Sequence, residues 1–252
     1  MNTPLTVTIM AAGEGKRMNS TLPKILHLFN EKPMLIRIIE EVLKLIPSKI
    51  IIITGKYDLL IKSTIYQYIT ELNKIVFVQQ KNPVGTGDAI NSTLDQYSNN
   101  ENVLILNGDM PLIKLNLLEK FIDVNKITDL SAKLLVAELD NPYGYGRIIY
   151  DSENNFIDIK EEKDCDNIEK NIKIVNVGIY LFKSYILKKY IPMITNNNAQ
   201  KEYYLTDIIK IIKNNSEIEI KTYLVEDNLK YQINGVNTQE ELINLQNKYR
   251  SL

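Results

Sequence analysis

A short segment with two glycines, Met10–Met18, carries the side chains best suited to bind an anion. Its sequence, MAAGEGKRM, follows an apolar run and places Lys16 and Arg17 beside the glycines. Glycine and alanine let a backbone approach a ligand closely, and exposed amide N–H groups bind anions. Lys24 adds a third cation shortly afterwards. The alternative is an ordinary glycine turn with solvated basic residues. We favour a turn that binds a polyphosphate.

This segment differs from the two common phosphate-binding motifs. Met18 stands where the dinucleotide-binding fingerprint has its third glycine. Arg17 stands where a P-loop has the Ser or Thr that binds magnesium, and the first glycine of a P-loop is missing. The segment therefore predicts phosphate binding of another kind.

Two further clusters follow predicted strands. Asp109 lies in the run LILNGDMPL, at the carboxyl end of a strand, where open α/β folds bind ligands. A carboxylate there can hold magnesium, which prefers oxygen ligands, although a lone Asp before Pro111 is more often part of an ordinary turn. Gln80, followed by Gly85-Thr86-Gly87, offers an amide for the edge of a base. Taken alone this cluster is weak evidence, because Gly-Thr-Gly turns are common.

The elements that must position these residues alternate along the first half of the chain. Apolar runs and helical periodicity predict strands at Leu5–Met10, Lys49–Thr54, Ile75–Gln79 and Asn102–Asn107, and helices at Met34–Ile46, Asp58–Leu72, Gly87–Tyr97 and Leu115–Val124. This alternation predicts an α/β fold whose central sheet is mixed but mostly parallel, with helices on both faces.

The second half is less regular. The same patterns predict strands at Ala132–Glu138, Arg147–Tyr150, Phe156–Glu161, Lys173–Phe182 and Glu217–Val225, and helices at Tyr185–Ile191 and Tyr204–Lys213. Thr238 with Glu241 fits a capping box, so a last helix should begin after Thr238. We expect residues 1–227 to form one domain and residues 228–252 an appended segment.

The composition excludes several classes of protein. The 252 residues include 30 Lys and Arg, 31 Asp and Glu, one His and one Cys. The balanced charge argues against a broad surface for nucleic acid or anionic membrane. One cysteine excludes an internal disulfide framework, a Cys-based zinc site and an iron–sulfur cluster. Neither a signal peptide nor a membrane-spanning apolar run is present, which predicts a soluble, cytoplasmic protein.

Other residues with reactive side chains have simpler explanations. We expect His27 to pack against the fold and Cys165 to lack a partner that would make it a nucleophile. The Asp164-Cys165-Asp166 run matches the Asp-x-Asp metal motif of many glycosyltransferases, but a charged surface loop explains it better because no buried strand precedes it directly.

Taken in their order along the chain, the motifs around Gly13, Gln80 and Asp109 resemble those of the sugar-nucleotide pyrophosphorylases. The resemblance is strongest to the nucleotidyltransferase domain of bacterial N-acetylglucosamine-1-phosphate uridyltransferases. The resemblance runs from about Thr6 to Asn237. Besides the segments above, the stretches that carry it are Tyr143–Arg147 (YGYGR), Glu161–Asp164 (EEKD), Val175–Gly178 (VNVG), Asn196–Asp207 (NNNAQKEYYLTD) and Gly235–Asn237.

The resemblance implies a Rossmann-like nucleotidyltransferase fold and a magnesium-dependent reaction. UTP and N-acetylglucosamine 1-phosphate would give UDP-N-acetylglucosamine and pyrophosphate, with no nucleic-acid or membrane partner. The implied catalytic residues are Arg17, Lys24 and Asp109, and the implied magnesium ligands are Asp109 and Asn237. The implied nucleotide contacts are Met10, Ala11, Ala12, Gly13, Lys24, Gln80, Gly85, Thr86, Asn107 and Gly108. The implied sugar-pocket residues are Gly146, Glu161, Asn176 and Tyr203 or Tyr204.

The chain departs from the family pattern at several positions. Lys16 replaces a Thr or Ser and should add charge beside the triphosphate. Asp88 replaces a common His, and we expect this position to matter little. Val177 replaces a hydroxyl residue, which should remove a hydrogen bond to the sugar or phosphate. The chain has no hexapeptide repeats, so we expect neither acetyltransferase activity nor a trimer built on a β-helix, and a monomer or a dimer stays open.

Three alternatives remain open on the sequence alone. The protein could use another sugar 1-phosphate, of the UDP-glucose or dTDP-glucose type. It could be a non-catalytic nucleotide-sugar sensor with the same fold, although Arg17, Lys24 and Asp109 are all present. A glycosyltransferase would leave the Met10–Met18 segment unexplained.

Overall fold

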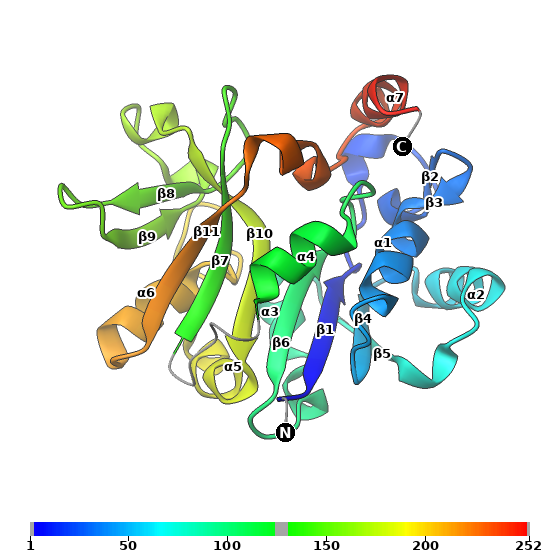
Figure 1. The fold of residues 1–252 in the computed structure, drawn as a ribbon, viewed down its shortest axis with the longest axis horizontal. Coiled ribbons are helices and arrows are strands. Elements are labelled where there is room, and N and C mark those ends of the chain that lie inside the picture. The colour runs from blue at the N-terminus through cyan, green and yellow to red at the C-terminus, as the bar shows by residue number, and fades with distance from the viewer. Residues whose placement is uncertain (1–2, 124–130, 251–252) are drawn as a thin grey trace.

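The protein is built around a central β-sheet, shown in Figure 1. The computed structural model describes residues 3–123 and 131–250. Within these residues, the strands of the sheet follow the order β11-β7-β10-β6-β1-β4-β5, while β8 pairs with β10 and β9 pairs with β8. Their bounds are β1 Leu5–Met10, β4 Lys49–Thr54, β5 Ile75–Gln79, β6 Asn102–Asn107, β7 Ser131–Glu138, β8 Arg147–Tyr150, β9 Phe156–Lys160, β10 Ile174–Lys183 and β11 Glu219–Leu224.

The sheet is mixed and mostly parallel, which confirms the predicted fold class. β1 pairs in parallel with β6 and β4, and β4 with β5. β10 is antiparallel to both β6 and β7, whereas β11 is parallel to β7. In register, Met10 lies beside Ile53 and Asn107, and Thr54 beside Gln79. The carboxyl ends of four strands therefore meet at one edge of the sheet.

Helices cover both faces because the central strands are apolar on both sides. Successive strand side chains alternate in direction, so Ile50 and Ile52 of β4 enter one apolar cluster and Ile51 and Ile53 another. The first cluster includes residues of α1 (Met34–Leu43), α2 (Asp58–Tyr68) and α4 (Leu115–Ile122). The second includes residues of α3 (Thr86–Asn91), α5 (Ser184–Tyr190) and α6 (Asp207–Asn215). No helix among residues 3–123 and 131–250 is both long and apolar enough to cross a membrane.

The last described residues pack against the N-terminal part of the chain. A 3₁₀ helix, Asp227–Ile233, leads to α7 (Gln239–Lys248), which Figure 1 shows beside the N-terminal segment at the upper edge. Val236 and Leu242 join Met18 in a third apolar cluster. The segment is therefore fixed next to the loop that follows β1.

The predicted start of α7 is confirmed. The hydroxyl of Thr238 accepts a hydrogen bond of 3.1 Å from the backbone N–H of Glu241. The Glu241 carboxylate in turn accepts from the N–H of Asn237 at 2.6 Å. Both bonds satisfy N–H groups at or next to the helix start that no helical carbonyl can reach.

Several helices are shorter than predicted. α1 ends at Leu43, and Pro47 disfavours continued helical backbone at Ile46, which has a φ of +52°. α2 ends at Tyr68, and α3 ends at Asn91 before a separate 3₁₀ turn, Leu94–Gln96. α6 starts at Asp207 instead of Tyr204. The predicted end of α4, Val124, lies outside the described residues. The short strands β2 (Leu28–Phe29) and β3 (Lys32–Pro33) were not predicted.

Candidate functional site

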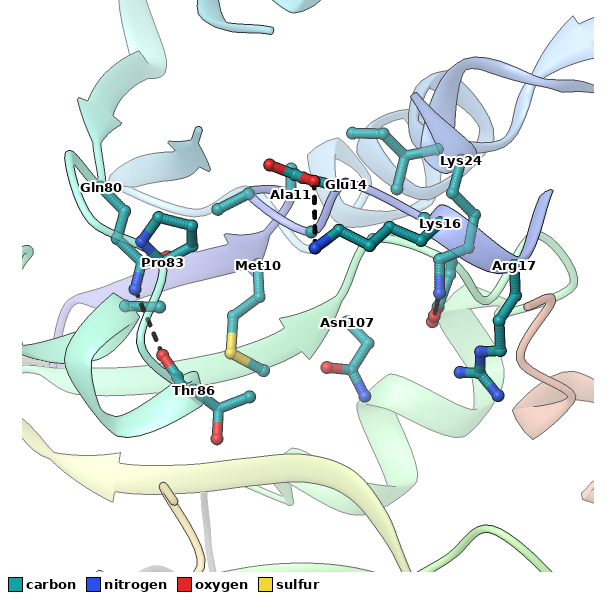
Figure 2. A pocket seen from close by; sticks show the side chains of 18 of the residues that line it. Met10, Ala11, Glu14, Lys16, Arg17, Lys24, Gln80, Pro83, Thr86 and Asn107 are labelled. Carbon is teal, nitrogen blue, oxygen red and sulfur yellow. Dashed lines mark hydrogen bonds and ion pairs between the residues drawn. The ribbon is translucent and has the colours of Figure 1, made fainter. Parts of the chain in front are cut away.

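A cleft opens at the edge where the parallel strands end. It has a volume of about 510 Å³. Figure 2 shows Gln80 and Thr86 on one side of it, Arg17 and Lys24 on the opposite side, and Asn107 between them. The predicted site residues that line it are Met10, Ala11, Ala12, Gly13, Arg17, Lys24, Gln80, Gly85, Thr86, Asn107, Gly108 and Asp109. The structure therefore brings together all the predicted nucleotide contacts.

The loop after β1 turns sharply beside Lys24. Gly15 has a φ of +65°, and a Cβ at this position would lie 2.5 Å from the Cβ of Lys24. Glycine suits both the left-handed backbone and this close approach. The loop then forms a single 3₁₀ turn, Lys16–Met18, whose last residue is buried in the third apolar cluster. The buried Met18 thus anchors the loop, while Lys16 and Arg17 stay exposed.

Three segments that are distant in the chain meet at the basic end of the cleft. The ammonium group of Lys24 forms an ion pair with Asp109 and lies 3.0 Å from Oδ1 of Asn237. The guanidinium of Arg17 donates to the same oxygen, also at 3.0 Å. The side chains of Lys24 and Asp109 are 15% and 19% exposed. The predicted catalytic residues and metal ligands thus form one hydrogen-bonded cluster.

The oxygens of Asp109 and Asn237 have the chemistry of a magnesium site. Both contact the ammonium group of Lys24, so they converge on one cation. Carboxylate and amide oxygens suit Mg²⁺, which commonly takes its other ligands from water and phosphate. In the described part of the chain, no group of three or more His, Cys, Asp or Glu residues could hold a metal. These two protein oxygens, together with the oxygens of a polyphosphate, would therefore suit magnesium once the Lys24 ammonium has moved away from them.

The turn at Gly85 forms the opposite end of the cleft. Gly85 has a φ of +127°, and a Cβ there would lie 2.7 Å from the backbone nitrogen of Tyr203. The Thr86 hydroxyl accepts from the N–H of Leu205 at 2.9 Å. Gln80 is 4% exposed and donates from Nε2 to the Gly85 carbonyl at 3.2 Å. The backbone around residues 203–205 thus fixes the turn against which Gln80 rests.

The predicted sugar-pocket residues lie outside the lining of this cleft. The N–H of Asn176 donates to the carbonyl of Gly146 at 2.8 Å, and a Cβ on Gly146 would lie 3.6 Å from Oε2 of Glu161. Burial raises the pKa of the Glu161 carboxyl, and the Thr206 hydroxyl donates to it at 2.8 Å. Nδ2 of Asn176 donates to the Tyr180 hydroxyl at 2.6 Å. Gly146, Glu161 and Asn176 therefore form a separate polar group.

The two candidate tyrosines have different surroundings. Tyr203 lines a second cavity, of about 580 Å³, and not the cleft. Tyr204 is 7% exposed, and burial, with the nearby carboxylates of Asp164 and Glu161, raises the pKa of its phenol to about 12. A role of either side chain in holding a sugar stays a prediction.

The structure shows the surroundings of two residues that depart from the family pattern. Val177 is 2% exposed and packs in the first apolar cluster with Val175 and Ile179, so its side chain belongs to the core. The carboxylate of Asp88 accepts a hydrogen bond of 2.6 Å from Nε2 of Gln80, and the expectation that this position matters little stays a prediction. Position 88 therefore contacts a residue of the cleft directly.

The cleft also contains charged residues that the sequence analysis did not assign to it. Glu14 lines the cleft and lies 3.6 Å from Lys16, which is 86% exposed. Glu202 lines it as well, because the side chain of Asn198 bonds to both the N–H and the carbonyl of Glu202 and holds the loop. The Asn-rich run indicates such a loop, but nothing in its sequence indicates that Glu202 reaches the cleft.

The remaining candidates lie elsewhere. Cys165 is 6% exposed, and burial raises the pKa of its thiol, which suppresses the thiolate that a nucleophile requires. Asp164 accepts from the N–H of Ala199, and Asp166 accepts from N–H groups within its own loop. These carboxylates stabilise the loop by accepting hydrogen bonds from backbone N–H groups, which confirms the prediction of a charged loop.

Comparison with known sequences identifies relatives along nearly the whole chain. The profile of the nucleotidyl transferase family matches residues 6–226. A probable UDP-N-acetylglucosamine pyrophosphorylase of Acanthamoeba polyphaga mimivirus is 44% identical over 94% of this chain and 93% of its own length. The bifunctional protein GlmU of Francisella tularensis subsp. holarctica (strain OSU18) is 38% identical over 96% of this chain. The chain spans only 51% of that bifunctional relative.

Solved structures share the fold at low sequence identity. A UDP-glucose pyrophosphorylase in complex with UDP-glucose superposes with a TM-score of 0.73 at 17% identity, over 98% of both chains. A putative glucose-1-phosphate thymidylyltransferase from Bacillus anthracis, in complex with a sucrose, gives a TM-score of 0.71 at 19% identity, over 98% of this chain and 96% of that one. These likenesses concern the arrangement of the sheet and helices.

Proposed function

The chain belongs to the nucleotidyl transferase family, and we propose that it transfers the uridylyl group of UTP to N-acetylglucosamine 1-phosphate. The products are UDP-N-acetylglucosamine and pyrophosphate. The choice of nucleotide and sugar is supported by the name of the relative that is 44% identical over 94% of the chain. The observation that carries the proposal is the polarity of the cleft, which has a cationic end and an amide-bearing end.

The two ends of the cleft match the two ends of UTP. Arg17 and Lys24 supply positive charge where the phosphates would lie, and Lys16 adds another cation at the rim. Gln80 and the turn at Gly85 supply hydrogen-bonding groups at the other end, where the base would lie. The loop after β1 offers its backbone between them.

The chemistry requires positioning and charge neutralisation, and no protein nucleophile. An oxygen of the sugar phosphate attacks the α-phosphorus of UTP in line, a new P–O bond forms, and the bond to pyrophosphate breaks. The attacking oxygen is already an anion, so no general base is needed. Arg17 would hold the departing pyrophosphate, and Lys24 would orient the phosphates.

Asp109 and Asn237 would hold a magnesium ion in this reaction. Bound there, the ion would offset the repulsion between the two phosphates. Lys24 would exchange its contact with Asp109 for one with a phosphate oxygen as the substrates enter. In the sugar pocket, Gly146 would leave space beside Glu161, and Asn176 keeps one amide hydrogen that it does not give to Tyr180.

Pyrophosphate release tests the proposal. The protein is incubated with UTP, magnesium and N-acetylglucosamine 1-phosphate, and in parallel with glucose 1-phosphate. Release that requires the acetylated sugar supports the proposal. Release with glucose 1-phosphate alone would keep the reaction and replace the sugar. No release with either sugar, combined with binding of UDP-sugar, would indicate a sensor.

Variants test the assigned roles. Asp109→Ala and Arg17→Ala should each lose at least about 3 kcal/mol of transition-state stabilisation, on the order of 100-fold in rate. The circular dichroism spectrum should stay unchanged, because both side chains lie at the cleft. Near-normal turnover by both folded variants would contradict the proposed roles.

A further inference from the structure

The amide nitrogen of Gln80 is held by two acceptors. Nε2 donates to Oδ2 of Asp88 at 2.6 Å and to the carbonyl of Gly85 at 3.2 Å. A carbonyl oxygen can only accept a hydrogen bond, and so can an ionised carboxylate. These partners therefore fix which end of the amide is nitrogen, and they engage both of its hydrogens.

Gln80 can therefore offer a ligand only its amide oxygen, which accepts a hydrogen bond. The side chain lines the cleft and is 4% exposed. Within residues 3–123 and 131–250, no hydrogen bond from another protein group to Oε1 is found. A ligand at this end of the cleft consequently meets an oriented acceptor, whereas a freely rotating glutamine would offer either an acceptor or a donor.

An oriented acceptor distinguishes the two common pyrimidines. Uracil carries a hydrogen on N3, which donates to such an oxygen. Cytosine presents an unprotonated N3 at the same place, so two lone pairs would face each other. A site that leaves a polar group unpaired with the wrong ligand discriminates strongly against it.

Asp88 itself lies outside the cleft. It lies in α3 and lines the second cavity, on which Tyr203 also borders, and not the cleft. Its position is fixed because the N–H of Gly87 donates to the carbonyl of Tyr203 at 2.7 Å. Asp88 is thus placed to act on a nucleotide only through Gln80.

We propose that Asp88 is a positioning residue for base selection: its carboxylate turns the amide oxygen of Gln80 toward the base, so that the cleft accepts uracil and rejects cytosine. The inference rests on the proposed use of a uridine nucleotide. It goes beyond that proposal because it assigns the selectivity to a contact behind the cleft.

The test measures the dissociation constants of UTP and CTP by calorimetric titration, which needs no turnover. The ratio of the CTP to the UTP constant should fall about tenfold in Asp88→Ala. Asp88→Asn should keep most of the ratio, because its amide oxygen can accept the same hydrogen bond. Asp95→Ala removes the same charge from an exposed position nearby and should change nothing.

A double-variant comparison separates positioning from a structural effect. Gln80→Ala should lose the selectivity by itself, and adding Asp88→Ala should lower the ratio no further. An unchanged ratio in folded Asp88→Ala would overturn the inference, as would an equal fall in the Gln80→Ala background or a wild type that binds UTP and CTP equally. A wild type that selects UTP but releases no pyrophosphate would refute the proposed reaction alone, and the variants would still decide the role of Asp88.

Discussion

Lys24→Met should tighten the binding of Mn²⁺ to the nucleotide-free protein by about tenfold. In the wild type the Lys24 ammonium contacts both proposed metal-ligating oxygens, those of Asp109 and Asn237, so a divalent cation must displace it. The paired side chains are only 15% and 19% exposed, and their contact should exceed the roughly 0–1 kcal/mol of an exposed pair. A contribution of about 1.4 kcal/mol corresponds to a factor of ten. Methionine keeps an apolar stem and removes the charge.

The assay counts free Mn²⁺ by electron paramagnetic resonance at constant ionic strength and without nucleotide, so transfer activity does not enter the result. Lys16→Met is the matched control. Lys16 carries the same charge on the loop beside Lys24, but it is 86% exposed and lies beside Glu14. Lys16→Met therefore shows how the loss of one positive charge changes the Mn²⁺ affinity when the lysine does not contact the metal ligands.

Equal Mn²⁺ affinities of the two variants would refute the reasoning, because the Lys24 ammonium would then not compete for the metal position in solution. Weaker binding by Lys24→Met would refute it as well. Adding Asp109→Asn to Lys24→Met should abolish the gain, which ties the binding to the proposed ligand.

Other changes probe the pH dependence, a helix cap and the loop after β1. Asp207→Asn should raise the melting temperature at pH 8 but not at pH 4. Burial, followed by the neighbouring carboxylates, raises the pKa of Asp207 from 3.8 to about 6, so the wild type loses stability as the pH rises across this window; an equal difference at both pH values would contradict this cause. Thr238→Ala should lower the free energy of unfolding in urea by about 1 kcal/mol, since the N–H of Glu241 loses its acceptor, and Thr238→Ser should restore most of it. Gly15→Ala should keep the fold and weaken UTP binding at least about tenfold, because the added Cβ would displace Lys24; unchanged binding would show that the loop relaxes.

Local sequence was sufficient for the strands of the central sheet and for the edge of that sheet that carries the cleft. The four consecutive isoleucines of β4 fit only a strand buried on both faces, and all four are fully buried. Because parallel strands end together, Asp109 and Gln80 could be placed at one edge before any contact was known. These predictions depend only on residues that are close together in the sequence.

The contacts between distant segments could not be predicted in this way. Nothing in the local pattern around Asn237 marks it as a partner of Lys24, and only the family resemblance suggested its role. The bond from Gln80 to Asp88 depends on the turn that the backbone of Tyr203 fixes from another part of the chain. The burial of Val177 could have been predicted, since side chains alternate between the two faces of β10. Asn176 lies on the polar face, so Val177 must lie on the apolar face.

The separation of 213 positions between Lys24 and Asn237 also sets the order in which the site can form during synthesis. At roughly 5–20 residues per second, a ribosome that has added Lys24 reaches Asn237 about 10–40 s later. Before that moment β1 to β11 have all been synthesised, whereas Arg17 and Lys24 still lack the amide oxygen of Asn237 to which both donate. The cationic end of the cleft is therefore completed after the last strand of the sheet has been synthesised, so the proposed triphosphate site cannot form before the sheet's strands are all present.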